Sequence, residues 1–293
     1  MAVDQGPVVQ SAILRGELVA LRKQNVLTQG DVARDLEWST SKLIRVEGGH
    51  SSITKVDLDA LLTRYGVGSS AERERLQRLN RAARLRGWWD AHKNDVSAPY
   101  LNYVGYEAGA TFIRQFPGTV VPGLLQTGDY AEALTARMID GTKVAPVVKL
   151  RLQRQTELAQ RSDPPRHYYV LDEAVIRRHV GIGTDPAIMP NQLRHIADVA
   201  AGSDLITVRL IPFTAGEHAG LSGAFTLLEF DGGLPELLYL DTGRGELADI
   251  TGEDPQVAEY AANFELLLEQ ALPESESITF MRSVADEMFR SVR

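Results

Sequence analysis

The sequence contains no cysteine. This absence excludes disulfide bonds, cysteine-ligated zinc, iron–sulfur clusters and a cysteine nucleophile. Long apolar runs are also lacking, because no segment approaches the ~20 apolar residues that a membrane-spanning helix needs. The first residues show no basic stretch followed by a long apolar one, so we expect no signal peptide. These absences predict a cytoplasmic protein without a membrane partner.

The chain has 293 residues, of which 44% are hydrophobic. That length and composition suit two folded domains. The net charge of −8 is unevenly distributed: residues 1–85 carry a net charge of +3 and the remaining residues carry −11. DNA phosphate attracts the first part and repels the second. We therefore expect any nucleic-acid contact to come from the N-terminal part.

Four helices are expected in the first 69 residues, over 9–25, 28–36, 40–47 and 57–65. Their apolar residues recur at spacings of three and four, as amphipathic helices require. Thr28 can cap the second helix, with Asp31 three residues later as its acidic partner. Glycines follow the third and fourth helices, where the chain leaves through positive φ. Residues 1–69 are thus predicted to form an all-α domain.

The most informative pattern is LTQGDVARDLEWSTSKLIRVE at 27–47. Two short helices joined by a tight turn can place the second helix in the DNA major groove. The positions where the two helices must touch are apolar or small: Val32, Ala33, Leu36, Leu43 and Val46. The polar positions left to face outward are Ser39, Thr40, Ser41, Lys42 and Arg45. Short hydroxyls and basic groups at such positions are typical of contacts to base edges and phosphates.

This segment resembles the phage-repressor-like, xenobiotic-response-element family of helix-turn-helix transcription regulators. It departs from the family pattern at Glu37 and Trp38, where the turn usually has glycine and a small apolar residue, and at Ile44, which is often polar. The resemblance implies a role for each matching position. Bases would be read by Thr40, Ser41 and Arg45, phosphate or base would be bound by Ser39 and Lys42, and Gln29 would bind phosphate and brace the recognition helix.

The same resemblance implies that Arg22 and Glu47 form an internal ion pair with a structural role. Modules of this kind bind as dimers, with two recognition helices about one DNA turn apart, ~34 Å. We therefore expect a homodimer on double-stranded DNA.

Residues 70–98 are expected to form a basic linker helix, helical over 71–91, whose arginines are either solvated or in contact with DNA. Residues 99–293 mix expected strands and helices, which predicts an α+β domain with a partly antiparallel sheet. The expected strands lie at 111–116, 167–171, 205–211, 224–230 and 236–241. The expected helices lie at 127–139, 146–161, 173–180, 186–201, 254–272 and 274–291.

No catalytic, metal or cofactor motif was found in this second domain. Its histidines lack metal-ligand spacing, and the pair Glu217 and His218 is interpreted as a polar loop tip. The glycines around Ile182 lack the residues of a phosphate loop and are interpreted as a helix stop, and GLSG at 220–223 does not match a hydrolase nucleophile motif. We expect no enzyme, no cofactor and no metal.

The blocks FIRQFPGTVVPGLLQTGDYAEAL, YYVLDEAVIRRHVG and ITVRLIPFTAGEHAGLSGAFTLLEF resemble a C-terminal domain common in actinobacterial regulators. That family is described as antitoxin-like and is often encoded beside a small partner protein, so the resemblance implies such a partner. Two hypotheses stay open: a module for dimerisation and partner binding, or a small-molecule sensor. An open groove would favour the first and a closed pocket the second. The segments 121–126 and 212–223 are candidates to line either one.

Overall fold

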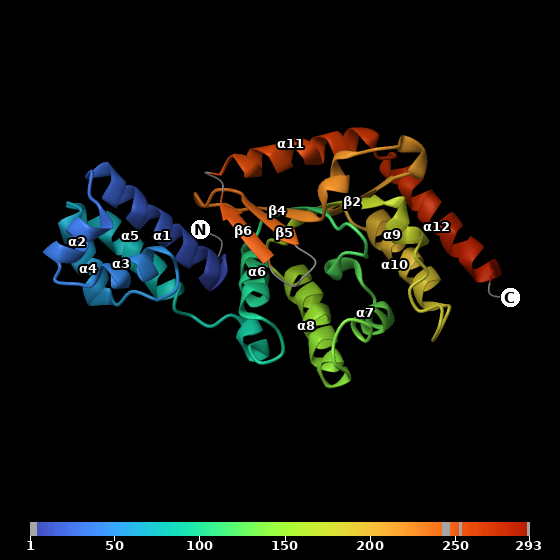
Figure 1. Ribbon diagram of the computed structural model, residues 1–293, viewed down its shortest axis with the longest axis horizontal. Coiled ribbons are helices and arrows are strands. Elements are labelled where there is room, and N and C mark those ends of the chain that lie inside the picture. The colour runs from blue at the N-terminus through green and yellow to red at the C-terminus, as the bar shows by residue number, and fades with distance from the viewer. Residues whose placement is uncertain (1–4, 242–246, 252–253, 292–293) are drawn as a thin grey trace. The chain divides into compact units, whose positions relative to one another are not determined.

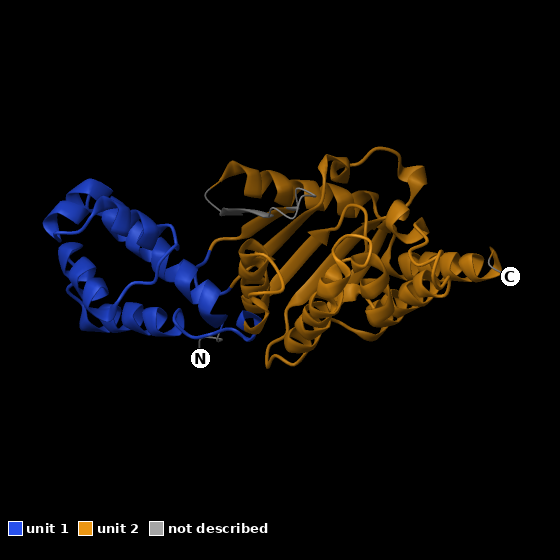
Figure 2. Ribbon diagram, turned by 60° about the horizontal axis from the view of Figure 1, so that its bottom comes forward, with its two compact units in different colours: residues 1–90, 231–234 blue, residues 91–230, 235–293 orange. Residues whose placement is uncertain are grey.

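The structure is a computed structural model that describes residues 5–241, 247–251 and 254–291, with no side chains described at 241 and 247–251. The chain divides into two compact units, coloured separately in Figure 2. The first unit comprises Met1–Asp90 and Asp231–Leu234, and the second comprises Ala91–Phe230 and Pro235–Arg293. No helix in the described ranges is long and apolar enough to cross a lipid bilayer.

The first unit is built from five helices around one apolar core. These are α1 (Gly6–Gln24), α2 (Gln29–Asp35), α3 (Thr40–Glu47), α4 (Lys55–Arg64) and α5 (Ser70–Ala82). Each helix contributes to the core, which includes Leu18, Val32, Leu43, Leu58, Leu61 and Leu76. The predicted caps are present, because Thr28 and Asp31 form a capping box at α2 and Ser39 caps α3. Local spacing in the sequence thus determines where α2 and α3 begin.

The first four helices all end in the same way. After each helix, one residue adopts positive φ, and the next residue donates its N–H to the carbonyl five positions earlier, which is a Schellman motif. Glycine takes the positive φ after α3 and α4, at Gly49 (77°) and Gly66 (72°). Val26 (55°) and Glu37 (56°) take it after α1 and α2, although a Cβ atom strains this conformation. The two turns on either side of α2 are therefore strained.

Replacing either strained residue with glycine should stabilise the first unit. We expect Val26→Gly and Glu37→Gly each to raise its free energy of unfolding by about 0.5–1 kcal/mol, because relief of strain outweighs the added entropy of the unfolded chain. Urea unfolding followed by tryptophan fluorescence measures this, since Trp38, Trp88 and Trp89 all belong to the first unit.

The matched control is Gly66→Ala, whose new methyl group would meet no atom within 4 Å. Only its positive φ opposes the substitution, so it should destabilise the unit by about 1 kcal/mol. Unchanged stability in all three variants would contradict the assignment of strain to these turns.

Helix α5 differs from the expected linker at 70–98. The helix expected over 71–91 ends at Ala82, and a 3-10 turn covers Trp88–His92. Leu76 is fully buried in the core of the first unit, and α5 packs along α1. The compact unit therefore runs past the expected boundary at residue 69, because the apolar stripe of α5 is part of the helical core.

The second unit contains a six-stranded mixed sheet in the order β3-β2-β1-β4-β5-β6. Its strands are β1 (Phe112–Phe116), β2 (Arg166–Asp172), β3 (Ile206–Ile211), β4 (Phe225–Glu229), β5 (Leu237–Asp241) and β6 (Leu247–Thr251). Strand β2 pairs in parallel with β1 and β3, and the remaining pairs are antiparallel. This confirms the predicted fold class, a helical domain followed by an α+β domain with a partly antiparallel sheet.

Helices cover both faces of this sheet (Figure 1). They are α6 (Ala98–Gly109), α7 (Gly128–Thr135), α8 (Gly141–Ala159), α9 (Glu173–Arg177), α10 (Ile188–Gly202), α11 (Pro255–Gln270) and α12 (Glu274–Ser291). Helix α11 packs on one face through a core that contains Phe116, Phe225 and Phe264. Helices α10 and α12 pack on the other face against Tyr169 and Val208. Short 3-10 turns at Gly123–Leu125, Phe213–Ala215 and Ala219–Ser222 complete the unit.

Two elements of the second unit were not expected from the sequence. Helix α6 buries five successive residues, 103–107, so its apolar pattern lacks the period of a helix with one buried face. Strand β6 is five residues long and lies at an edge of the sheet, where a strand has only one neighbour to pair with.

The second unit should lose stability in acid because of one buried imidazole. His167 is 8% exposed and stacks on the ring of Tyr169, and burial lowers its pKa from 6.5 to about 4. Between these values the unfolded chain binds a proton that the folded unit does not. Stability is therefore fully present above pH 6.5 and falls as the pH drops towards 4, by about 3 kcal/mol at most.

Calorimetric melting of the full chain between pH 4 and 7 measures this loss. His167→Gln should flatten the dependence in that window, whereas exposed His50→Gln in the first unit should leave it unchanged. An equally steep dependence in His167→Gln would exclude His167 as the source.

Candidate functional site

The candidate site is the outward face of α3. Leu43 and Val46 point into the core of the first unit and fix the rotation of this helix. The same rotation leaves Thr40, Ser41 and Arg45 exposed on the other side. Among the described residues, no carboxylate lies within ion-pair distance of Arg45. A free guanidinium beside two hydroxyls suits contacts to base edges in a DNA groove.

Ile44 belongs to the same exposed face, with 48% of its surface accessible. Sequence reasoning noted its departure from the family pattern but assigned it no role. An apolar residue at an outward-facing position was the signal that could have identified it. An exposed aliphatic group at this place can contact the methyl group of thymine.

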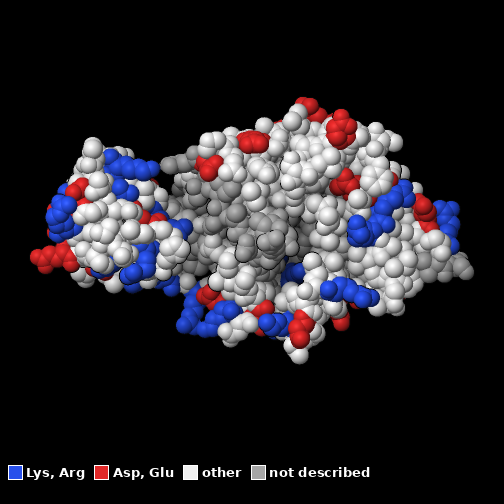
Figure 3. Space-filling model, in the orientation of Figure 1, with Lys and Arg blue, Asp and Glu red and all other residues white. Residues whose placement is uncertain are grey.

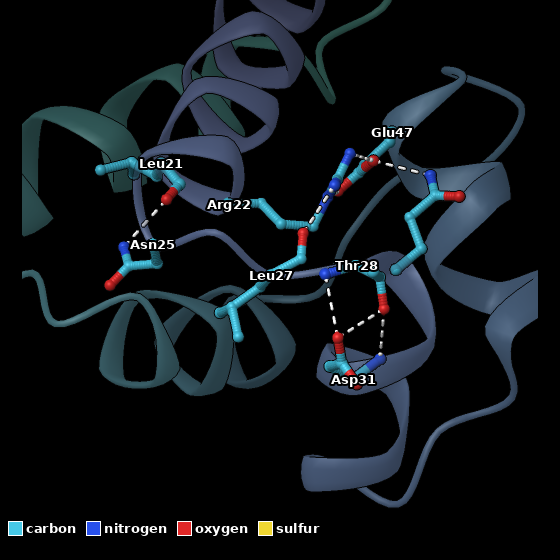
Figure 4. A network of polar contacts seen from close by, with 8 residues as sticks. Leu21, Arg22, Asn25, Leu27, Thr28, Asp31 and Glu47 are labelled. Atoms are coloured by element: carbon cyan, nitrogen blue, oxygen red, sulfur yellow. Dashed lines mark hydrogen bonds and ion pairs between the residues drawn. The ribbon is translucent and has the colours of Figure 1, made fainter.

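A largely buried ion pair fixes α3 against the helices that precede it (Figure 4). Arg22, near the end of α1, donates from Nε and Nη2 to the two carboxylate oxygens of Glu47, at 2.7 and 2.9 Å. The side chains of Arg22 and Glu47 are 14% and 4% exposed. Arg22 also donates to the carbonyl of Leu27, at 3.0 Å. One guanidinium thus links the end of α1, the turn before α2 and the end of α3.

Gln29 completes this network by donating from Nε2 to Glu47 Oε2, at 2.7 Å. The bond ties the first residue of α2 to the last residue of α3, which is the bracing contact that the family resemblance implies. Its side-chain oxygen would repel a phosphate, so only the second amide N–H and the backbone N–H at the start of α2 can donate to one. Contact between Gln29 and phosphate stays a prediction.

Lys42 has contacts that the sequence did not predict. Its ammonium group lies 3.8 Å from the ring centre of Trp38 and 3.0 Å from Asp57 Oδ1. Trp38, the atypical turn residue, thus makes a cation–π contact with the lysine of the helix that it precedes. Ser39 is also engaged, because its hydroxyl accepts the N–H of Lys42 at 3.2 Å. Ser39 and Lys42 therefore support the turn. Thr40, Ser41 and Arg45 are exposed and take no part in these contacts.

The carboxylate of Glu47 is buried near a second polar group, the Tyr65 hydroxyl. That hydroxyl has no hydrogen-bond partner among the described residues, and burial raises its pKa.

Away from this centre, Lys, Arg, Asp and Glu side chains are interspersed over the visible face of the first unit (Figure 3). On α3 itself, the exposed Arg45 has no ion-pair partner among the described residues, whereas Lys42 pairs with Asp57.

Removing the Glu47 carboxylate should destabilise the first unit strongly. We expect Glu47→Ala to lower its free energy of unfolding by about 3 kcal/mol or more, because Arg22 is left charged, largely buried and unpaired. Tryptophan fluorescence during urea unfolding measures the change.

Asp35→Ala is the matched control. It breaks the ion pair between Arg64 and Asp35, whose side chains are 31% and 40% exposed. A pair so accessible to water should contribute less than about 1 kcal/mol. Equal losses in the two variants would show that the Glu47 network contributes no more stability than an exposed ion pair.

Comparison with known families agrees with the division of the chain. Residues 13–76 match a family model described as a helix-turn-helix domain, so the first unit contains such a domain. Residues 100–283, more than half of the chain, match the model of a domain of unknown function, DUF5753. No curated protein and no solved structure matches the chain.

Proposed function

We propose, from the premise that the chain belongs to the DUF5753 family and carries a helix-turn-helix domain, that it regulates transcription by binding a specific DNA sequence. In this proposal α3 enters the major groove, and the protein acts as a regulator rather than as an enzyme. The observation that carries it is the unpaired guanidinium of Arg45 beside Thr40 and Ser41 on the exposed face of α3. Placement in the xenobiotic-response-element group is part of the same proposal.

The residues divide into two roles. Thr40, Ser41 and Arg45 read base edges, with Ile44 against a thymine methyl group. Ser39, Lys42 and Gln29 hold the turn and the helix in register, and any of their remaining donors serve phosphates. Regulators of this type place two such helices one DNA turn apart, so the proposed active species is a homodimer on a two-fold operator.

Arg45→Ala should weaken binding to the preferred DNA sequence by about 1–3 kcal/mol and relax base preference at one position of each half-site. The full chain selects that sequence from a pool of random duplexes, and fluorescence anisotropy then measures affinity. Arg45→Lys keeps the charge but lacks the planar fork that pairs with guanine, so it should lose specificity as well.

Arg166→Ala is the control, because it removes an exposed arginine from the second unit. Its affinity should equal that of the unchanged chain. A footprint with two symmetric half-sites is expected for the dimer. An Arg45→Ala variant with unchanged base preference would refute the assignment of the recognition helix.

For the DUF5753 unit we propose dimerisation and the binding of a small protein partner, as in antitoxin-like regulators. An open groove of about 750 Å³ along α8, bordered by Glu132 of α7, supports this proposal, with Ala145, Val148 and Leu152 in its wall. Leu152, in this wall, is 36% exposed. Exposed apolar surface of this kind is typical of protein interfaces. Proteins retained by the tagged chain but not by its Leu152→Glu variant would report on the partner.

The alternative is a small-molecule sensor that alters DNA affinity. A specific observation favours it: the same unit contains a second, more enclosed cavity whose lining combines aromatic rings with a few polar groups. Such a cavity is the usual form of a ligand site. The two proposals concern different surfaces of one unit and are compatible.

A further inference from the structure

The second unit contains a partly open cavity of about 230 Å³ that the proposed DNA contact does not use. It lies between α6, α8, the segment 117–126 and strands β1, β4 and β5. At ~30 Å³ for each water molecule, this volume corresponds to about eight waters, the size of a single-ring organic molecule.

Aromatic rings form much of the wall. The rings of Tyr103 and Tyr239 lie 4.4 Å apart, and those of Tyr100 and Tyr103 lie 6.3 Å apart and nearly parallel. Phe225 and Pro122 add further apolar surface. Flat faces of this kind favour a planar, aromatic occupant.

Another part of the wall, the segment 121–126, is held in place by side chains that bond to its backbone. Gln126 and Gln192 donate to the carbonyls of Val121 and Leu125, at 2.8 and 2.6 Å. Gln155 donates to the carbonyls of Gly123 and Gln126, at 3.0 and 2.8 Å. The segment that the sequence singled out at 121–126 is therefore rigid, and the cavity is formed before any ligand enters.

One of the two arginines in the lining is neutralised. Arg154 donates to both oxygens of Glu107, at 2.6 and 2.8 Å, and both residues are almost fully buried. Burial alone would lower the pKa of Arg154, but the charge and hydrogen bonds of Glu107 together with the nearby hydroxyls of Tyr100 and Tyr103 outweigh it and raise that pKa. Arg154 also donates to the Tyr100 hydroxyl, at 2.6 Å, which leaves the proton of that hydroxyl free for another acceptor.

The other arginine keeps its charge. Arg151 donates only to neutral groups among the described residues, namely Gln126 Oε1 at 3.1 Å and Thr135 Oγ1 at 3.0 Å. No aspartate or glutamate stands among the described residues that line the cavity. A partly buried, uncompensated guanidinium favours an anion, and its planar fork matches a carboxylate.

We propose that this cavity binds a small planar aromatic carboxylate, with its anionic group on Arg151 and its ring against the tyrosines. The Tyr100 hydroxyl supplies a second donor. Ligand binding itself rests only on the cavity. Its consequence for DNA affinity rests on the proposed ligand-responsive function.

Benzoate is the probe, and benzamide and acetate are its matched controls. Calorimetric titration of the full chain should show saturable binding of benzoate. Benzamide lacks the charge and acetate lacks the ring, so each should bind at least about tenfold more weakly. Absence of benzoate binding, or equal binding of the three probes, would overturn the proposal.

Variants locate the site. Arg151→Gln should weaken benzoate binding about tenfold or more, and Val120→Phe should abolish it by filling the cavity without changing any charge. Arg166→Gln, an exposed arginine outside the cavity, should bind benzoate like the unchanged chain. If Arg151→Gln does not fold, Val120→Phe decides the question. Unchanged binding in Val120→Phe refutes the site.

Affinity for the selected DNA duplex, measured with and without benzoate, separates the two proposals. If benzoate binds without changing DNA affinity, the proposed ligand site is supported and the proposed sensor function is refuted. Benzoate binding by a chain that binds no duplex selectively removes the regulator function. Sequence-specific DNA binding without benzoate binding removes the ligand site alone.

Discussion

The carboxylate of Glu47 holds the helix-turn-helix together. Arg22 donates two bonds to it from α1 and Gln29 donates one from α2, while Glu47 itself is the last residue of α3. Three helices are thus fixed by one nearly buried anion, whose loss would leave a buried cation unpaired. The accessible pair of Lys42 and Asp57 adds far less stability and serves instead to support the turn. The exposed face of α3 depends on this internal network, although no member of the network lies on that face.

The second unit uses buried polar groups in a comparable way. Three glutamines bond to the backbone of one wall segment, and Glu107 neutralises Arg154 behind the tyrosines. Because these groups are satisfied internally, Arg151, which has no anionic partner among the described residues, is available for a ligand. The residues after 85 carry a net charge of −11, so a cavity lined by an unpaired arginine contrasts with the acidic character of this part of the chain. Figure 3 shows both acidic and basic side chains on its visible surface.

Sequence patterns predicted most elements of the fold because their signals are local. Caps such as Thr28 with Asp31, and apolar spacing within single helices and strands, act over a few residues. Helix α6 was missed because sheet and helices bury it on several sides, which removes the periodic pattern. Helix α5 was expected to continue to residue 91, yet it ends at Ala82 and belongs to the first core through Leu76. Strain at Val26 and Glu37 could not be predicted from the sequence either, because valine and glutamate rarely adopt positive φ.

The sequence by itself determined the helix-turn-helix, the outward position of Thr40, Ser41 and Arg45, and the α+β class of the second unit. Tertiary structure decided which polar groups stay available. Lys42 is held by Trp38 and Asp57, and His218, expected at a polar loop tip, is turned inward onto Asp172 at 2.9 Å. The cavity likewise joins residues from 100 to 239. The reason is physical: caps and periodicity depend on neighbours along the chain, whereas ion pairs and cavities depend on the packing of residues that lie far apart in it.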